Sequence, residues 1–204
     1  QKRDNIVVTH GAIGANALVH ETMISPGDHV ISICPTYQQH YSIPESFGAK
    51  LDILWLRPEN DFLPDLEELG RILRPNTKLV VLNNPNNPTG ALLMGANLEE
   101  FVAVVRTSGA YILCDEVYRG TNQVGNGFAP AMADIYEKGI SVSSMSKVFS
   151  LAGIRLGWIA APREVLEAVS IRRDYNTISV GMIDDYFASL ALENKEQIIG
   201  RSQK

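Results

Sequence analysis

The stretches KLVVLNNPNNPTG (residues 78–90) and AYILCDEVY (residues 110–118) decide the fold class. In each stretch, a run of apolar residues without a polar alternation ends abruptly in polar side chains. A strand that is apolar on both faces is typical of a parallel sheet covered by helices on each side. The polar residues that follow such a strand lie at its carboxyl end, where open α/β sheets bind their ligands.

The same pattern recurs along the chain, with further strand-like runs at residues 5–9, 29–33, 51–56, 140–143 and 156–160. Between the runs, apolar residues recur at helical spacing, and we expect these stripes to face the core. Three such stripes lie within residues 15–23, 98–105 and 183–191. Alternating strands and helices predict an α/β fold: a three-layer α/β/α domain with a mostly parallel sheet of about seven strands.

Composition narrows the classes of partner. The 204 residues carry a formal net charge of −5 without a Lys/Arg-rich run, which argues against a nucleic-acid partner. No apolar stretch approaches the roughly 20 residues that span a bilayer, so we expect no membrane partner.

Cys34 and Cys114 end apolar runs and are interpreted as buried free thiols in a reducing, cytoplasmic setting. The four histidines match no metal-ligand spacing; we interpret them as ordinary core or surface residues and expect no metal.

Small residues follow the first strand. The segment HGAIGAN (residues 10–16) is a tight turn that opens a helix, and its free backbone N–H groups suit a phosphate. It is neither GxGxxG nor a Walker P-loop, which argues against a nucleotide-binding dehydrogenase. A plain strand-to-helix turn accounts for the composition equally well.

Polar and aromatic residues follow the later strands. Tyr37 comes after the second strand and Asn87 after the strand at residues 78–82. Asp115 directly follows a buried strand, where an unpaired charge is costly, so it requires a cationic partner. Tyr118 stands three residues further on.

The last of these strand ends is the segment SMSKVFSLAGIR (residues 144–155). It contains Ser144, Lys147 and Arg155, and by itself it is weak evidence for any site.

The joint order of these features resembles the class I/II aminotransferases, the fold type I family of pyridoxal phosphate (PLP) enzymes. The order is a small-residue turn, Pro-x-aromatic, Asn-Pro-x-Gly, Asp-x-x-Tyr and Ser-x-x-Lys with an arginine eight residues later. The resemblance extends from Gly11 to at least Arg155.

The resemblance implies a role for each catalytic residue. Lys147 would hold PLP as a Schiff base and later move a proton. Asp115 would pair with the pyridine nitrogen and keep it protonated. Tyr118 and Asn87 would donate to the phenolate oxygen of the cofactor.

The resemblance also implies the remaining cofactor contacts. Tyr37 would stack on the ring, and Ser144 and Arg155 would bind the phosphate. The amides of the turn at Gly11, Ala12 and Ile13 would complete that anchor. Ser146 is assigned only to packing or capping.

The function implied is transfer of an amino group between an amino acid and a 2-oxo acid by a cytoplasmic homodimer. Residues 41–48 and 173–181 depart from common aminotransferases and resemble arginine-handling enzymes of antibiotic biosynthesis. A PLP-dependent oxidase or hydroxylase of an amino acid such as arginine, or a β-lyase, is therefore the alternative. A non-catalytic sensor domain of aminotransferase-like build is a further alternative.

The chain begins with Gln1 rather than methionine and stops before the carboxylate-binding arginine of the family's small domain. We therefore expect residues 1–204 to be the PLP-binding large domain, an internal fragment without the N-terminal segment and the C-terminal small domain. The fragment by itself is expected not to transaminate.

Overall fold

A computed structural model describes residues 3–121 and 128–202, and this part of the chain contains a seven-stranded sheet of order β1-β7-β6-β5-β4-β2-β3. β7 runs antiparallel to both of its neighbours, and the other strands share one direction. The strands are β1 (Ile6–His10), β2 (His29–Cys34), β3 (Lys50–Trp55), β4 (Thr77–Asn83), β5 (Tyr111–Asp115), β6 (Gly139–Ser144) and β7 (Leu156–Ala160). Each lies within one residue of its predicted bounds, so the α/β fold with a mostly parallel sheet is confirmed.

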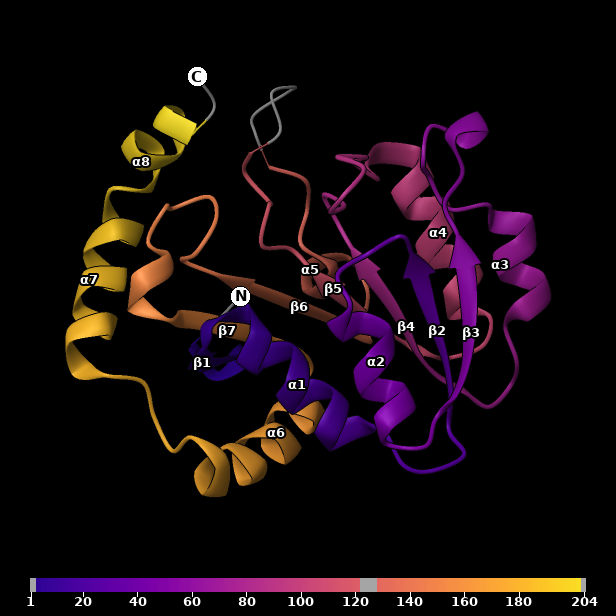
Figure 1. Cartoon of the computed structure of the whole chain (residues 1–204), viewed down its shortest axis with the longest axis horizontal. Coiled ribbons are helices and arrows are strands. Elements are labelled where there is room, and N and C mark those ends of the chain that lie inside the picture. The colour runs from indigo at the N-terminus through magenta and orange to yellow at the C-terminus, as the bar shows by residue number, and fades with distance from the viewer. Residues whose placement is uncertain (1–2, 122–127, 203–204) are drawn as a thin grey trace.

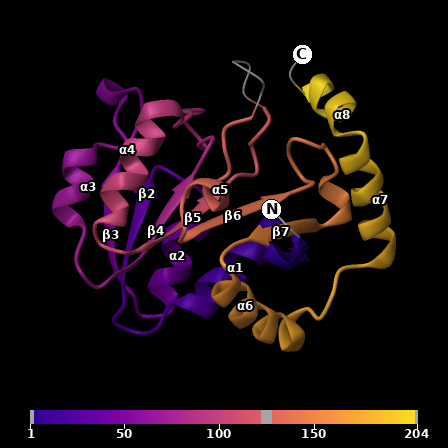
Figure 2. The same cartoon turned by 180° about the vertical axis from the view of Figure 1, so that it is seen from behind.

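Helices flank the sheet on both sides (Figures 1 and 2). They are α1 (Gly11–Met23), α2 (Gln39–Ser46), α3 (Leu66–Ile72), α4 (Gly95–Arg106), α5 (Met132–Ile135), α6 (Arg163–Asn176), α7 (Met182–Glu193) and α8 (Lys195–Ser202). Short 3-10 turns occur at η1 (Arg3–Asn5), η2 (Pro58–Asn60) and η3 (Ala152–Ile154).

Two apolar cores lie on opposite faces of the sheet. In β4, Leu79 and Val81 pack with α1 and α6, whereas Val80 and Leu82 pack with α3, α4 and α5. Successive side chains of a strand point to opposite faces, so a strand covered on both sides is apolar throughout. This explains the uninterrupted run that begins the stretch at residues 78–90.

The apolar stripe predicted within residues 183–191 does not face the core as expected. Ile183, Tyr186 and Phe187 of α7 are 68%, 61% and 50% exposed, while Ala188 and Ala191 are buried. α7 packs through its small residues against a third core beside β7, at the end of the sheet away from α3 and α4 (Figure 1). Hydrophobic spacing indicates which side of a helix is apolar, but not what covers that side.

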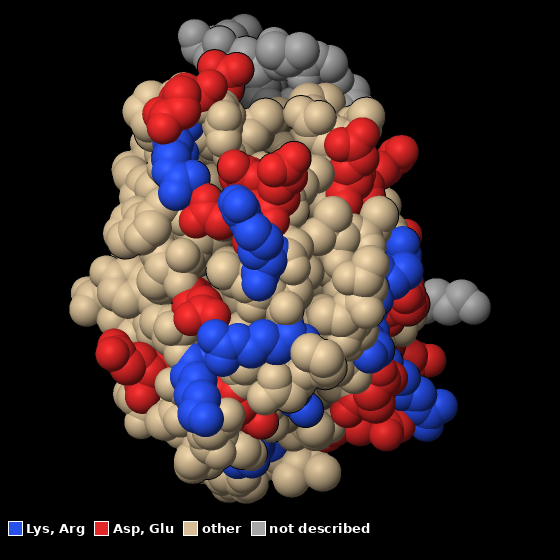
Figure 3. All heavy atoms as spheres, turned by 90° about the vertical axis from the view of Figure 1, so that its right-hand side faces the viewer, with Lys and Arg blue, Asp and Glu red and all other residues tan. Residues whose placement is uncertain are grey.

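Charged side chains of both signs interleave on the face that carries α3 and α4 (Figure 3). Several are paired there or nearby, including Arg57 with Glu68 at 2.6 Å and Arg106 with Glu137 at 2.9 Å. Among the described residues, no helix is long and apolar enough to cross a membrane.

Gly157 of β7 permits the close approach of α1 to the sheet. A Cβ at this position would overlap the carbonyl carbon of Gly11 and lie 2.7 Å from the amide nitrogen of Ala12. We expect Gly157→Ala to lower the free energy of unfolding by about 1–3 kcal/mol, because backbone atoms must shift to admit the methyl group.

Gly70→Ala is the matched control for this prediction, because a Cβ at Gly70 in α3 meets nothing within 4 Å. This variant is expected to be unchanged or up to about 1 kcal/mol more stable, since alanine favours helix. Urea denaturation measures both values, and equal stability of the two variants would show that the contact at Gly157 is not tight.

Candidate active site

A cavity of about 280 Å³ opens where β4, β5 and β6 end and α1 begins. Because β7 runs in the opposite direction, Arg155, which precedes β7, reaches the same edge of the sheet as residues that follow the other strands. The lining residues are Ala12, Ile13, Asn16, Tyr37, Gln39, Asn83, Asn87, Asp115, Val117, Tyr118, Ser144, Ser146, Lys147, Ala152 and Arg155. Nine of the ten predicted cofactor-binding residues therefore share one cavity, and the tenth, Gly11, adjoins Arg155.

One part of the cavity combines two sources of positive charge. Arg155 lies so close to the start of α1 that a Cβ on Gly11 would be 2.9 Å from its Nη2 atom. In the part of the chain that the structure describes, no carboxylate pairs with Arg155, and the first turn of α1 has neither an acidic residue nor a side-chain cap. A guanidinium beside an uncapped helix N-terminus is an arrangement that an anion such as phosphate stabilises.

A buried carboxylate lies further along α1. Asp115, the last residue of β5, accepts a hydrogen bond on Oδ2 from Asn16 Nδ2 at 2.7 Å and one on Oδ1 from the amide of Val117 at 3.1 Å. Asn16 is five residues beyond Gly11, which corresponds to roughly 7 Å along the helix. The cavity is therefore lined by Arg155 beside the start of α1 and by a buried carboxylate that is held by a later residue of the same helix.

A buried histidine, His40, lies beside Asp115, and a second buried histidine, His20, neighbours His40. His40 of α2 places Nε2 3.4 Å from Asp115 Oδ2. Behind it, burial and then the neighbouring His40 lower the pKa of His20 to about 3, so His20 is neutral at neutral pH. The interpretation of the histidines as ordinary residues was therefore incomplete for His40.

Sequence reasoning also missed Asn16. Asn16 and His20 are spaced i, i+4 on α1, and both are buried on a side of the helix that otherwise packs into the core. The signal in the sequence was a pair of polar residues four positions apart within an otherwise apolar stretch of the predicted helix. Nothing in the sequence near His40 indicates its proximity to Asp115.

Asparagine side chains position the loop after β4. Asn83 donates through Nδ2 to the carbonyl of Asp115 at 2.8 Å and accepts on Oδ1 from the amide of Asn87 at 2.7 Å. Asn84 makes two hydrogen bonds with the backbone of Leu93, at 2.8 and 2.9 Å. These bonds tie β4 to β5 and hold the backbone of Asn87 at the cavity.

Lys147 is an exposed residue held between buried neighbours. Met145 and Val148 are almost fully buried, and the amides of Met145 and Leu151 bond to the carbonyls of Leu156 and Met145 at 3.0 and 2.9 Å. The Lys147 Nζ atom lies 5.8 Å from the centre of the Tyr118 ring. The amine thus reaches the cavity from a backbone segment fixed on both sides.

Tyr37 stands at the rim of the cavity and is half-exposed. Its ring meets that of His40 edge-on, with centroids 6.4 Å apart. Tyr37 therefore presents a partly exposed ring at the cavity.

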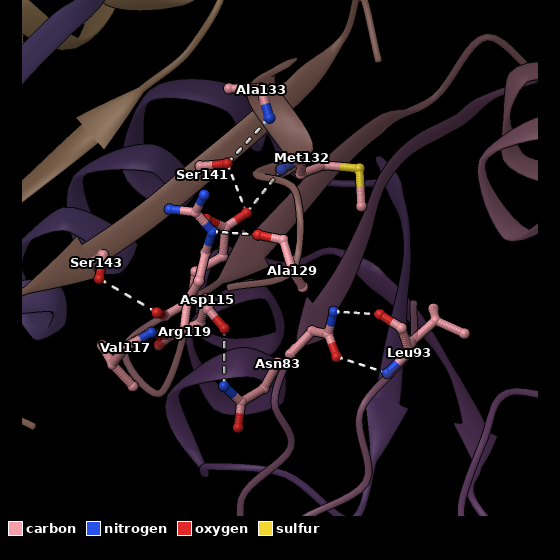
Figure 4. Close-up of polar contacts among 12 residues, drawn as sticks. Asn83, Leu93, Asp115, Val117, Arg119, Ala129, Met132, Ala133, Ser141 and Ser143 are labelled. Atoms are coloured by element: carbon pink, nitrogen blue, oxygen red, sulfur yellow. Dashed lines mark hydrogen bonds and ion pairs between the residues drawn. The ribbon is translucent and has the colours of Figure 1, made fainter. Parts of the chain in front are cut away.

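A second buried carboxylate, Glu116, lies outside the cavity lining. Its Oε1 accepts hydrogen bonds from the amide of Met132 and the hydroxyl of Ser141, both at 2.7 Å. Arg119, 4.0 Å from its Oε2, donates to the carbonyl of Ala129 (Figure 4). Burial raises the pKa of Glu116 to about 7, and its bonds join β5, β6 and α5.

Comparisons with known proteins agree with this geometry. The model of the family "Aminotransferase class I and II" matches residues 1–197, and the chain belongs to that family. It is 31% identical to capreomycidine synthase of Streptomyces vinaceus, over 95% of this chain and 50% of that protein. It is 30% identical to the aspartate/prephenate aminotransferase of Thermus thermophilus, over 95% of this chain and 50% of that protein.

A solved structure of an aminotransferase has the same fold. The PLP-dependent aminotransferase from Streptococcus suis superposes with a TM-score of 0.93 at 48% identity, over 98% of this chain and 53% of that one. The chain thus spans about half the length of the relatives that it matches.

The raised pKa of Glu116 predicts a pH-dependent effect of Glu116→Gln. Between pH 4.5 and about 7 the folded state holds a proton that the unfolded state has lost, so the wild type loses stability as the pH rises through this window. Glutamine keeps the acceptor and stays neutral. The stability of the variant relative to the wild type should therefore rise across the window, by at most about 1.4 kcal/mol per pH unit, and then stay constant.

Urea denaturation at a series of pH values measures this difference. A constant offset between the two proteins from pH 4.5 to 8 would mean that Glu116 is not protonated in the folded state near neutral pH.

Proposed function

We propose that this chain is the cofactor-binding large domain of a PLP-dependent aminotransferase that moves an amino group between an amino acid and a 2-oxo acid. The observation that carries the proposal is the single cavity in which an exposed lysine amine, a buried carboxylate and an arginine beside a helix N-terminus meet. The names of the relatives and of the superposed structure support it.

The residues present fit the cofactor. Arg155, Ser144 and the amides at Gly11, Ala12 and Ile13 would hold the phosphate, because they supply cationic and neutral donors. Among the described residues no carboxylate pairs with Arg155, and the first turn of α1 has no acidic residue. Ser146, whose Oγ is 3.5 Å from Arg155 Nη1, belongs to this group as a further polar neighbour.

Asp115 would bind the cofactor ring at its nitrogen. Its buried carboxylate would hold a proton on the pyridine nitrogen, and the Asn16 and Val117 donors keep the carboxylate in place. Tyr118 and Asn87 would donate to the phenolate oxygen, and Tyr37 would cover one face of the ring.

When bound, PLP supplies a conjugated ring that takes up the electron pair released at the substrate α-carbon. Lys147 would attach the cofactor through its amine and then carry the proton between the substrate Cα and the cofactor C4′ atom. The hydrogen-bonded backbone around Lys147 would keep the amine at the cavity. Asp115 would keep the ring nitrogen of bound PLP protonated.

A second candidate function uses the same site for a different reaction. It is that of an amino-acid oxidase or hydroxylase, acting on a substrate such as arginine, or of a β-lyase. The favouring observation is that one relative at 31% identity is named a synthase rather than an aminotransferase. A screen of amino acids with oxygen consumption followed in parallel separates oxidation from transamination.

The proposal also covers the further domain and the second subunit with which this chain would assemble. A longer protein would supply the small domain that binds the substrate carboxylate, and a second copy would complete a homodimer. Exposed apolar residues of α7, such as Tyr186 and Phe187, support burial of this surface against such a partner. The two buried free cysteines support a cytoplasmic location.

Lys147→Ala tests the proposed function most simply in the full-length protein that carries this chain. The wild type with PLP should show an absorption band at the edge of the visible range that borohydride abolishes. The variant should lack this band, because no other amine is placed at the cavity among its lining residues.

Lys78→Ala is the matched control, since Lys78 is an exposed lysine of β4 outside the cavity, and it should keep the band. Absence of the band from the wild type, or its persistence in Lys147→Ala, would refute the proposal.

A further inference from the structure

Asn16 is placed where α1 meets the buried carboxylate of β5. The side chain is 1% exposed and lines the cavity, and its Nδ2 atom donates to Asp115 Oδ2 at 2.7 Å. The orientation of the amide follows from chemistry, because the oxygen in that position would face the carboxylate with lone pairs on both sides.

This asparagine is costly as a core residue. Its Oδ1 is buried and has no hydrogen-bond partner among the residues that the structure describes. A leucine of similar size would remove this unsatisfied oxygen from α1, but it would also take the donor away from Asp115 Oδ2. Apolar packing therefore does not account for an asparagine at position 16, whereas its hydrogen bond to Asp115 does.

No other side chain in the described region replaces this donor at Oδ2. His40 Nε2 lies 3.4 Å away without hydrogen-bond geometry, and Val117 donates to the other oxygen. His20, one turn beyond Asn16 on α1, is kept neutral by burial and brings no charge to the cluster. Asn16 therefore supplies the hydrogen bond that holds Oδ2, while the amide of Val117 holds Oδ1.

We propose that Asn16 is a positioning residue that fixes the Asp115 carboxylate toward the ring nitrogen of the cofactor. The inference rests on the proposed function, since it assumes that the ring occupies the cavity. The 2.7 Å hydrogen bond from Asn16 occupies one lone pair of Asp115 Oδ2. Acceptor sites of Asp115 that are not bonded within the protein would then be available to the ring nitrogen. The same helix carries the phosphate amides at its first turn, so α1 sets both fixed points of the ligand.

Asn16→Leu in the full-length protein tests the proposal with two readouts besides activity. The first is the affinity for PLP, which should fall at least about tenfold, because a hydrogen bond to a charged group is lost. The second is the pH at which the absorption band of the bound cofactor titrates, which should shift because Asp115 has lost its donor at Oδ2. A residue that only packs would not move the titration.

Asn16→Asp is the conservative variant and covers the case in which the leucine variant does not fold. At low pH the introduced carboxyl is protonated and donates to Asp115, so PLP affinity should approach that of the wild type. As the pH rises, two neighbouring carboxylates repel each other and the affinity should fall. Val19→Ala is the matched control, because Val19 is a buried core residue of the same helix outside the cavity.

The control should keep PLP affinity within about twofold of the wild type while it loses stability. Wild-type affinity and titration in Asn16→Leu, or a pH-independent affinity in Asn16→Asp, would overturn the role of Asn16. A wild type without any PLP band would instead refute the proposed function, so the two failures are distinguishable.

Discussion

A carboxylate buried at the carboxyl end of β5 is the constraint on which the site depends. Asp115 is 5% exposed, and a buried charge must be compensated by donors or a cation. Asn16 from α1, the amide of Val117 and the nearby ring of His40 from α2 provide part of this compensation. The remaining acceptor capacity faces the cavity, where a protonated ring nitrogen would complete it.

Strand direction brings the rest of the site to this carboxylate. Parallel strands deliver Asn87, Asp115 and Lys147 to one edge, and the reversed β7 adds Arg155 from its own beginning. Gly157 lets α1 lie directly on β7, so that the first-turn amides and Arg155 face the same volume. A single helix thus connects the anion site with the carboxylate.

The sequence was informative where a residue's position follows from its neighbours along the chain. Apolar runs predicted the strands to within one residue, and the residues after them were brought together because strands of one direction end at one edge. The contribution of His40 depends on how α2 packs against α1, β2 and β3, which no local pattern encodes. The prediction that the apolar stripe of α7 faces the core was wrong, because periodicity does not reveal what covers the apolar side of a helix.

The central claim is that Lys147 is the residue that holds the cofactor. Borohydride reduction of the PLP-loaded full-length protein, followed by proteolysis and mass spectrometry, identifies the lysine that carries the cofactor. The account predicts a phosphopyridoxyl group on the peptide that contains Lys147 and none on peptides that contain Lys50, Lys78 or Lys138. Modification confined to another lysine, or no modification at all, would contradict it.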